Sequence, residues 1–288
     1  MQYRYTKQGV HLFNRASGTN ILVDEILCKN EILSVAPANV SIALTNRCNK
    51  SCAHCFAPKN VAELDYTMVC SWIDELNKNG CLGVGFGGGE PLLYPRLYEI
   101  CQHVHSATLM ACTLTTNGDY LDDEMARWML RYVNFVRIST NGEAIDYSRI
   151  ASLAGHLQIG INYLLNAQTF PTLMDAIERS AQIGVKEFLL LPQVRTKRCQ
   201  GVDSQFIAMV DDLLLSTKLP LRVTMSTLCS DGMKAVVQIP GDVGARQYLH
   251  ISADGLLKTS SFGDKGVPII GSGIIQAIKE VYHYEGVE

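Results

Sequence analysis

The stretch VSIALTNRCNKSCAHCF, residues 40–56, combines a strand-like run with a cluster of cysteines. Its first five residues, VSIAL, form a short apolar run of the kind that is buried on both faces of a parallel sheet. The polar segment that follows places Cys48, Cys52 and Cys55 within eight residues. We therefore predict a buried strand that ends near Leu44 and, at its carboxyl end, a loop that carries three thiols.

Similar apolar runs recur along the chain and alternate with amphipathic stretches. The strand-like runs cover residues 40–44, 82–86, 109–116, 133–140, 157–165 and 187–192, and the helical periods cover residues 68–79, 95–106, 122–132 and 171–183. In the first helical period, apolar residues follow the i, i+3, i+4, i+7 spacing of one buried face. Six strands alternating with helices predict an α/β fold, a partial (β/α)6 TIM-type barrel, with ligands at the carboxyl ends of its strands.

The two ends of the chain depart from this alternation. Residues 2–5, 10–14 and 20–26 have the pattern of short strands, with a turn at 16–19. Beyond residue 200 we expect a helix, an apolar segment, three short strands and a terminal helix, at residues 203–216, 219–225, 235–239, 248–253, 256–259 and 273–284. We therefore expect three regions: a small N-terminal β appendage (1–38), the barrel core (39–200), and a C-terminal region (201–288) that ends the barrel and forms a short α+β cap.

Composition narrows the class of protein. Apolar residues make up 47% of the 288 residues, so a large core is expected, and the net charge of −3 argues against nucleic acid or anionic membrane as a partner. The sequence has no evident secretory signal and no apolar run of about 18 residues that would span a membrane. Ten cysteines in 288 residues are a much smaller fraction than the roughly 8–10% that is typical of a disulfide scaffold. We expect a cytoplasmic protein in which thiols that do not pack in the core bind metal or take part in catalysis.

Three interpretations of the cysteine segment differ in what they require. Core packing is disfavoured because polar residues 49–51 separate the first two cysteines. A zinc site usually needs a second, separated C-x2-C pair, and none follows Cys52 and Cys55, while His54 is wedged between two ligands. An iron–sulfur cluster accepts thiolates readily, and three of them leave one iron of a 4Fe-4S cube open to a non-protein ligand.

The C-x3-C-x2-C spacing resembles the signature of the radical S-adenosylmethionine (radical SAM) enzymes. The segment FGGGEP, residues 86–91, follows the second strand-like run and is similar to the family's Gly-Gly-Glu-Pro element. The segments TTNG (115–118) and STNG (139–142) resemble the family's strand ends, although Asn141 stands where relatives often carry aspartate. The resemblance spans residues 40–195 and leaves both ends of the chain unexplained.

The resemblance implies an enzyme with one 4Fe-4S cluster, bound by Cys48, Cys52 and Cys55, and with S-adenosylmethionine as cofactor. One electron, supplied by a flavodoxin- or ferredoxin-type reductant, would cleave S-adenosylmethionine to a 5′-deoxyadenosyl radical that abstracts a substrate hydrogen. The implied cofactor contacts are His54 at the adenine, Gly88, Gly89 and Glu90 at the methionyl ammonium, Ser139 at the ribose hydroxyls, Asn162 at the ribose or carboxylate, and Thr116 and Asn117 at a strand end. For the polar residues, a plain strand-end turn or cap remains the alternative.

Residues after the sixth strand suggest a substrate contact. Arg195, with Lys197 and Arg198, forms a basic patch that is either a solvated loop or a clamp for a substrate carboxylate or phosphate. Of the remaining cysteines, we interpret Cys70, Cys81, Cys101 and Cys112 as core residues and leave Cys28, Cys199 and Cys229 unassigned.

The C-terminal region suggests a substrate class. Residues 248–262 resemble the hairpin of the SPASM/twitch-like extension of peptide-modifying members, but the cysteine expected near Ser260 or Ser261 is missing, so we expect a cap without a cluster. This likeness implies a ribosomally synthesised peptide as substrate and partner. A small metabolite or nucleotide, as in the molybdenum-cofactor cyclisation branch, is one alternative, and a non-catalytic metal-binding barrel is another. The N-terminal appendage is expected to serve as a lid or to pair its edge with a peptide.

Overall fold

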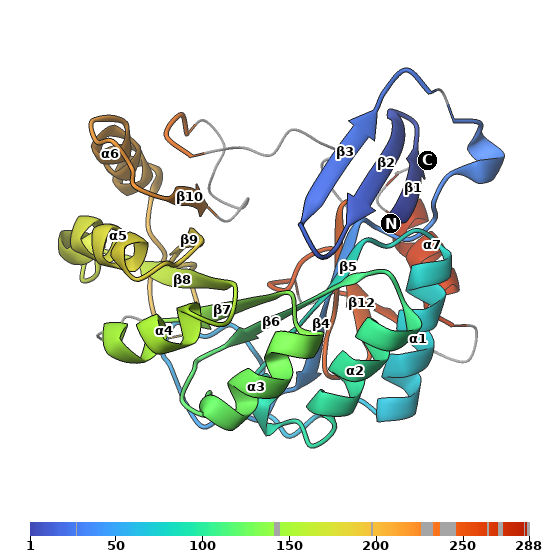
Figure 1. Ribbon diagram of the computed structural model, residues 1–288, viewed down its shortest axis with the longest axis horizontal. Coiled ribbons are helices and arrows are strands. Elements are labelled where there is room, and N and C mark those ends of the chain that lie inside the picture. Colours follow the sequence, from blue (N-terminus) through green and yellow to red (C-terminus); the bar gives the residue numbers. More distant parts are fainter. Residues whose placement is uncertain are drawn as a thin grey trace.

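A ten-stranded, mostly parallel sheet is the centre of the computed structural model, which describes residues 1–26, 28–140, 145–196, 198–225, 233–236, 246–263, 265–269, 273–284 and 286 (Figure 1). The strand order is β10-β9-β8-β7-β6-β5-β4-β11-β12-β13. The strands of the predicted core are β4 (Asn39–Thr45), β5 (Gly83–Gly88), β6 (Ala111–Thr116), β7 (Phe135–Ser139), β8 (Ile159–Leu165) and β9 (Glu187–Pro192). The predicted α/β partial barrel is confirmed, and among the described residues no pairing closes the sheet into a full barrel.

The C-terminal region extends this sheet at both ends. Strand β10 (Arg222–Met225) pairs in parallel with β9, so the apolar segment predicted at 219–225 contains a seventh barrel strand. At the other end β11 (Tyr248–Ile251) pairs in parallel with β4, and β12 (Leu256–Lys258) and β13 (Val267–Pro268) follow it antiparallel. The strand predicted at 235–239 lies mostly outside the described residues.

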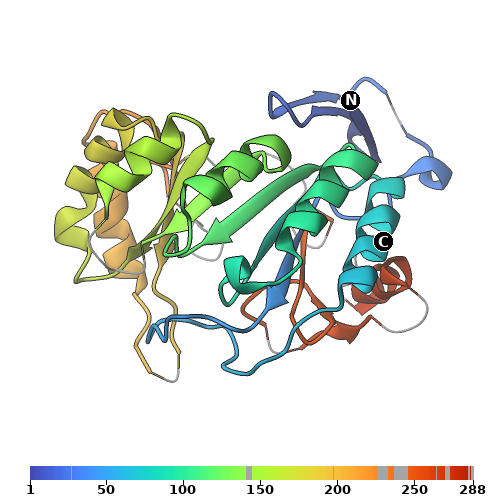
Figure 2. The same cartoon turned by 60° about the horizontal axis from the view of Figure 1, so that its bottom comes forward.

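The helices cover the outer face of the sheet. They are α1 (Tyr66–Lys78), α2 (Leu97–Ala107), α3 (Asp123–Tyr132), α4 (Tyr147–Ala154), α5 (Leu173–Gln182), α6 (Ser204–Leu215) and α7 (Ile274–Tyr284). Helices α1, α2 and α3 lie side by side along strands β4 to β6, and α7 packs against α1 (Figures 1 and 2). None of the helices in the described ranges is long and apolar enough to cross a membrane.

Local sequence explains where these helices begin and which face they bury. The Asp65 carboxylate accepts a hydrogen bond from the Met68 amide and caps α1, and the predicted apolar face is buried (Val69, Trp72, Ile73 and Leu76). Helix α4 was not predicted, because its eight residues bury only Ile150 and Leu153 and are too few to show a helical period.

The two faces of the barrel strands differ in side-chain type. On β4 and β5, Val40, Ile42, Val84 and Phe86 are each 1% exposed and pack under the helices. The residues between them point to the opposite face, which we call the inner face. The inner face of β5 carries only glycines, at positions 83, 85 and 87, so it is free of side chains along that strand.

The N-terminal residues form a separate three-stranded antiparallel sheet at the amino ends of the barrel strands. It comprises β1 (Gln2–Thr6), β2 (Gly9–Asn14) and β3 (Thr19–Val23). Arg4 of β1 is 2% exposed, and its guanidinium donates to the carbonyl oxygens of Ala36, Gly80 and Arg246. The appendage is thus anchored at the end of the barrel opposite to the cysteine segment.

Replacement of Arg4 by Met is expected to lower the free energy of unfolding by about 3 kcal/mol, because buried carbonyl groups lose their charged donor. Urea unfolding followed by circular dichroism measures this change. The matched control is Lys29→Met, which alters an exposed cation of the same region and should change the unfolding free energy by less than about 0.5 kcal/mol. Equal effects of the two substitutions would contradict the anchoring role of Arg4.

Candidate active site

The cysteine segment forms a loop whose two ends are held together. We define the cysteine loop as residues 46–63. The Asn46 amide donates to the Ala62 carbonyl oxygen at 2.9 Å, and the Leu64 amide donates to the Leu44 carbonyl oxygen at 3.0 Å. Arg47 and Glu63 form an ion pair at 2.6 Å across the same junction. The loop therefore leaves and re-enters at the carboxyl end of β4, and its cysteines lie where the barrel prediction expects a ligand.

The three cysteines of this loop are half-buried, and none of them forms a disulfide bond. Two N–H groups approach the Cys48 sulfur: the Lys50 amide at 3.4 Å and the Asn117 side-chain nitrogen at 4.0 Å. Donors of this kind stabilise a thiolate and tune iron–sulfur clusters. Within the described ranges, no three His, Cys, Asp or Glu side chains converge as they would around a single metal ion. In a cluster each thiolate binds a different iron, and the donor set of three thiols with N–H neighbours fits a 4Fe-4S cluster.

Gly88 and Gly89 allow two loops to approach each other closely. A side chain on Gly88 would meet the Thr45 carbonyl oxygen, and one on Gly89 would meet the Arg47 carbonyl oxygen. Gly88 also has a φ of +120°, which residues with a Cβ rarely adopt. The Gly89 amide donates to the Thr45 carbonyl oxygen at 2.7 Å. These two glycines thus approach the protein's own backbone, whereas the resemblance implied contact with the methionyl ammonium. Their predicted contact with the cofactor remains a prediction.

Glu90 joins the ends of β5 and β6 through its carboxylate. The side chain is 0% exposed and accepts hydrogen bonds from the Thr116 hydroxyl at 2.7 Å, the Asn117 amide at 2.8 Å and the Leu92 amide at 3.1 Å. Burial raises the pKa of Glu90, and these hydrogen bonds oppose that rise. Three of about four acceptor positions on the carboxylate are used by residues that the structure describes, which leaves one for the ammonium that we predict at this site.

A polar network ties the end of β6 to the cysteine loop. The Asn117 side chain donates to the Asn49 side-chain oxygen at 2.8 Å, and Asn49 donates to the Asp119 carboxylate at 2.7 Å. The Lys50 ammonium lies 3.3 Å from the other Asp119 oxygen. Asn49 and Lys50 stand between the first two cysteines, so Asp119 fixes the part of the loop that positions Cys48 and Cys52.

Replacement of Asp119 by Ala is expected to speed loss of the cluster roughly tenfold, because residues that orient metal ligands commonly contribute this much to retention. The measurement is the decay of brown absorbance when an iron chelator is added anaerobically to reconstituted protein. Asp119→Asn keeps an oxygen that can accept a hydrogen bond from Asn49, so its decay rate should lie between those of the wild type and Asp119→Ala. Glu124→Ala, an exposed acid at the start of α3, is the matched control. Equal decay rates in all four proteins would contradict a role for Asp119 in positioning the loop.

Ser139, the last residue of β7, lies beside Asn162 in the middle of β8. They are register partners, and the Asn162 side-chain nitrogen donates to the Ser139 hydroxyl at 3.4 Å. Asn162 is 6% exposed, and its side-chain oxygen has no hydrogen-bond partner among the residues that the structure describes. A buried acceptor without a partner costs about 1–3 kcal/mol, which a ligand donor would offset. This orphaned oxygen fits a ribose hydroxyl of S-adenosylmethionine.

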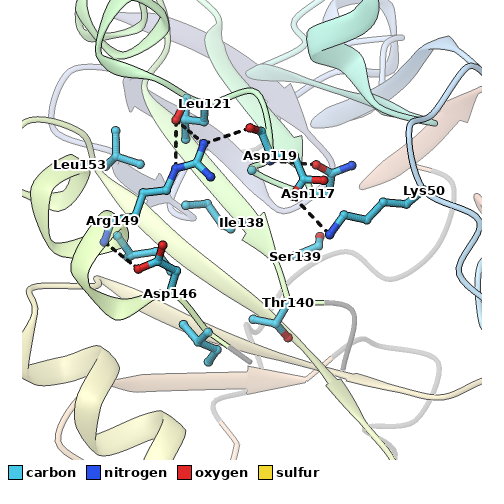
Figure 3. Close-up of a pocket in the computed structure, with 13 residues that line it drawn as sticks. Lys50, Asn117, Asp119, Leu121, Ile138, Ser139, Thr140, Asp146, Arg149 and Leu153 are labelled. Atoms are coloured by element: carbon cyan, nitrogen blue, oxygen red, sulfur yellow. Dashed lines mark hydrogen bonds and ion pairs between the residues drawn. The ribbon is translucent and has the colours of Figure 1, made fainter. Parts of the chain in front are cut away.

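A cavity of about 110 Å³ lies beside Ser139, between the ends of β6 and β7 and helix α4 (Figure 3). Asn117 and Ser139 line it, and Lys50 reaches it from the cysteine loop. The Arg149 guanidinium closes one wall by donating to the Leu121 carbonyl oxygen at 2.6 Å. Ordinary small-molecule pockets enclose about 300–1,000 Å³, so this cavity has room for only part of a cofactor.

The segment after β9 contacts the cysteine loop from the far side of the barrel. The Thr196 hydroxyl donates to the Ala53 carbonyl oxygen at 3.3 Å, and the Cys199 sulfur lies 3.8 Å from the same oxygen. Arg195, our predicted substrate contact, is exposed at the start of this segment, and His54 is half-buried. The roles of Arg195 and His54 remain predictions. Lys197, Asn141 and Cys229 lie outside the described residues.

Three residues that hold the cysteine loop in place were not among the predicted site residues: Asp119, Asn49 and Thr196. Asp119 directly follows the TTNG segment, so an acid next to that motif was the available signal. No sequence pattern identified Thr196, because its contact with Ala53 joins residues that are 143 positions apart.

Comparison with known proteins identifies a family that fits this geometry. A family model described as the radical SAM superfamily matches residues 42–193, more than half of the chain. The Fe-coproporphyrin III synthase of Methanosarcina barkeri is 27% identical over 130 residues, which cover 43% of this chain and 32% of that protein. The PqqA peptide cyclase of Streptomyces rochei is 32% identical over 126 residues, 40% of this chain and 34% of that protein. The matched stretches thus span about a third of the length of these relatives.

A solved structure extends the likeness to nearly the whole fold. Streptococcus suis SuiB bound to precursor peptide SuiA superposes with a TM-score of 0.74 over 99% of this chain and 88% of that chain, at 15% sequence identity. At this identity the likeness concerns the fold alone.

Proposed function

Because this chain belongs to the radical SAM superfamily, we propose that it is an enzyme that uses one 4Fe-4S cluster to cleave S-adenosylmethionine reductively and start radical chemistry on a peptide. The observation that carries the proposal is the joint placement of the three thiols of the cysteine loop with the Glu90 and Asn162 side chains. The thiols and Glu90 follow the carboxyl ends of β4 and β5, where parallel α/β folds bind ligands, and Asn162 of β8 is level with Ser139, the last residue of β7.

Cys48, Cys52 and Cys55 would hold the cluster. When bound, the cluster supplies the electron that splits S-adenosylmethionine and so generates the radical that abstracts a substrate hydrogen. The remaining roles belong to the chain itself. Asp119 and Asn49 orient the loop, the one acceptor position left on Glu90 binds the methionyl ammonium, and the orphaned Asn162 oxygen accepts from the ribose. Gly88 and Gly89 remain candidates for backbone contact with the ammonium, Thr116 and Asn117 act through Glu90, and His54 stacks on the adenine.

A ribosomally synthesised precursor peptide is the substrate and partner that we favour. One relative is named a peptide cyclase, and the SuiB fold, which nearly matches the whole chain, was solved with a precursor peptide. Strands β11 and β12 form the C-terminal hairpin whose sequence suggested the peptide-modifying branch. We further propose that Arg195 contacts the substrate, that the cap binds no second cluster, and that the chain works in the reducing cytoplasm with a flavodoxin- or ferredoxin-type reductant.

A small-molecule substrate is the second candidate. The similarity to an Fe-coproporphyrin III synthase, which is named for a tetrapyrrole product, favours it. A non-catalytic metal-binding barrel is the third candidate. Release of 5′-deoxyadenosine distinguishes an enzyme from it.

The proposed function is tested with anaerobically reconstituted full-length chain, dithionite and S-adenosylmethionine. We expect brown protein with about four iron atoms per chain beyond background, a count that follows from a single cluster, and release of 5′-deoxyadenosine. A colourless protein, or a brown one that releases none, would exclude the enzyme. To distinguish a peptide substrate from a small molecule, short precursor-like peptides encoded by neighbouring reading frames are added, and their masses are measured. The peptide hypothesis requires a mass change in one of them.

A further inference from the structure

Phe56 and Phe262 form an aromatic pair beside the cysteine loop. Their ring centroids are 4.3 Å apart at an angle of 45°. Phe56 directly follows Cys55, and Phe262 comes from the segment after β12. The two residues remain 48% and 37% exposed although they contact each other. Two neighbouring rings with so much free surface present an apolar face that the described part of the chain does not cover.

A network of hydroxyl groups fixes the turn that carries Phe262. The Phe262 amide donates to the Ser260 hydroxyl at 3.1 Å, and Ser261 hydrogen-bonds to the Tyr248 hydroxyl. The Tyr248 hydroxyl in turn lies 2.6 Å from the hydroxyl of Ser41, which is on the inner face of β4. The turn is therefore tied to the inner face on one side and to the cysteine loop on the other.

The same network remains uncharged near neutral pH. The Ser41 hydroxyl lies 2.6 Å from the His250 ring nitrogen Nδ1. Burial, together with the neighbouring Lys258 ammonium, lowers the pKa of His250 to about 4, so the imidazole is neutral near neutral pH. Burial raises the pKa of Tyr248, so its hydroxyl stays protonated. The polar groups nearest to the aromatic pair on this side can thus form hydrogen bonds without contributing a charge.

The sheet next to this network leaves space for a ligand group. Ser41 pairs with Gly85 of β5, and the inner face of β5 carries no side chains. A Cβ atom added at Gly85 would meet the Thr113 hydroxyl at 2.9 Å, whereas one added at Gly87 would meet no heavy atom within 4 Å. The inner face of β5 is therefore open at Gly87, two residues along the strand from the partner of Ser41.

We propose that Phe56 and Phe262 bind an uncharged apolar or aromatic side chain of the substrate and so hold that substrate next to the cysteine loop. This inference rests on the proposed function, because it takes the substrate to be a peptide. Aromatic rings gain most from burial against other apolar groups, and the neutral network gives a cationic group no partner of opposite sign.

The experiment uses reconstituted holoprotein with S-adenosylmethionine and three probes: N-acetyl-phenylalanine amide, N-acetyl-serine amide and N-acetyl-lysine amide. The chain is labelled with 4-fluorophenylalanine, and the fluorine signal of Phe262 is followed by NMR as each probe is added. We expect the phenylalanine probe to shift this signal and to bind at least fivefold more tightly than the other two. Equal binding of the three probes, or preference for the lysine probe, would overturn the proposal.

Variants test whether the pair binds the probe or only fastens two loops together. Phe262→Ala should weaken binding of the phenylalanine probe about tenfold. Phe262→Leu keeps an apolar side chain and should weaken that binding about threefold; it serves as the test if the alanine variant does not fold. Tyr284→Ala removes an aromatic ring that is 79% exposed on α7 and should leave binding unchanged. Loss of thermal stability in Phe262→Ala with unchanged probe affinity would show a fastening role and reject the site.

The outcome is separable from that of the proposed function. Brown colour and 5′-deoxyadenosine release are measured on the same preparations without probe. If both are present and the probe preference is absent, only the side-chain site fails. If the protein is colourless but the probe preference is present, the proposed radical chemistry fails and the site stands.

Discussion

Replacing Cys48, Cys52 and Cys55 together by alanine is expected to give a colourless protein that releases no detectable 5′-deoxyadenosine. The three thiols are the only cysteines of the cysteine loop, and the loop is held at the carboxyl end of β4 by hydrogen bonds on both sides. Removal of the ligands leaves that backbone intact, so the fold should survive while the cluster does not assemble. Iron content, visible absorbance and product release after anaerobic reconstitution measure the effect.

The matched control is Cys70→Ser, which changes a half-buried thiol on α1, away from the cysteine loop. This variant should retain its colour and its activity. Residual iron–sulfur absorption in the triple variant would contradict the proposal that the C-terminal cap holds no cluster. A folded triple variant, shown by an unchanged circular dichroism spectrum, is required for either conclusion.

Replacing Glu90 by alanine is expected to lower the free energy of unfolding by about 3 kcal/mol and to weaken S-adenosylmethionine binding about a hundredfold. The stability loss follows because the donors on Thr116, Asn117 and Leu92 lose their acceptor, at about 1–3 kcal/mol for each that stays buried. The binding loss follows because the ammonium loses a charged acceptor. Urea unfolding of the cluster-free chain and equilibrium binding to the reconstituted chain measure the two effects. Glu99→Gln, a surface carboxylate on α2 paired with Arg96, is the control and should change neither.

The same residue predicts a pH dependence with a defined sign. Because burial raises the folded-state pKa of Glu90 above its ordinary value of 4.5, the fold favours the protonated carboxyl. The part of its contribution to stability that depends on protonation is therefore complete below pH 4.5 and is lost as the pH rises through the folded-state pKa. The difference in unfolding free energy between the cluster-free wild type and Glu90→Gln should decline over that interval. A difference that grows with pH would contradict this assignment.

The strands of the core were predictable because each is a short, continuous apolar run bounded by turn residues. The predicted run at 187–192 matches β9 residue for residue, and that at 40–44 lies within β4. The N-terminal sheet was also predicted, but its position was not. Arg4 anchors it to carbonyl groups of residues as distant as Arg246, and contacts between remote parts of the chain leave no local periodicity.

The candidate site was partly predictable from residue chemistry. Three closely spaced thiols favour an iron–sulfur cluster, and the resemblance of the Gly-Gly-Glu-Pro element to that of the radical SAM family implies a carboxylate that binds a cation. The physical reason why positions 88 and 89 need glycine was not predictable. The carbonyl groups that leave no room for a side chain there belong to Thr45 and Arg47, at the end of a different strand. The same holds for Asp119, whose partners Asn49 and Lys50 lie across the barrel mouth.

The amino-acid sequence by itself determined the α/β class, the place of the cysteine loop after a buried strand, and the thiol chemistry of that loop. These follow from hydrophobic periodicity and from the nature of the side chains, both of which are local properties. Only the tertiary structure decided that Glu90 is buried among three donors, that Asn162 keeps an unused acceptor, and that Phe262 meets Phe56. Burial and pairing depend on which distant segments the sheet brings together, and that is set by the free energy of the whole fold.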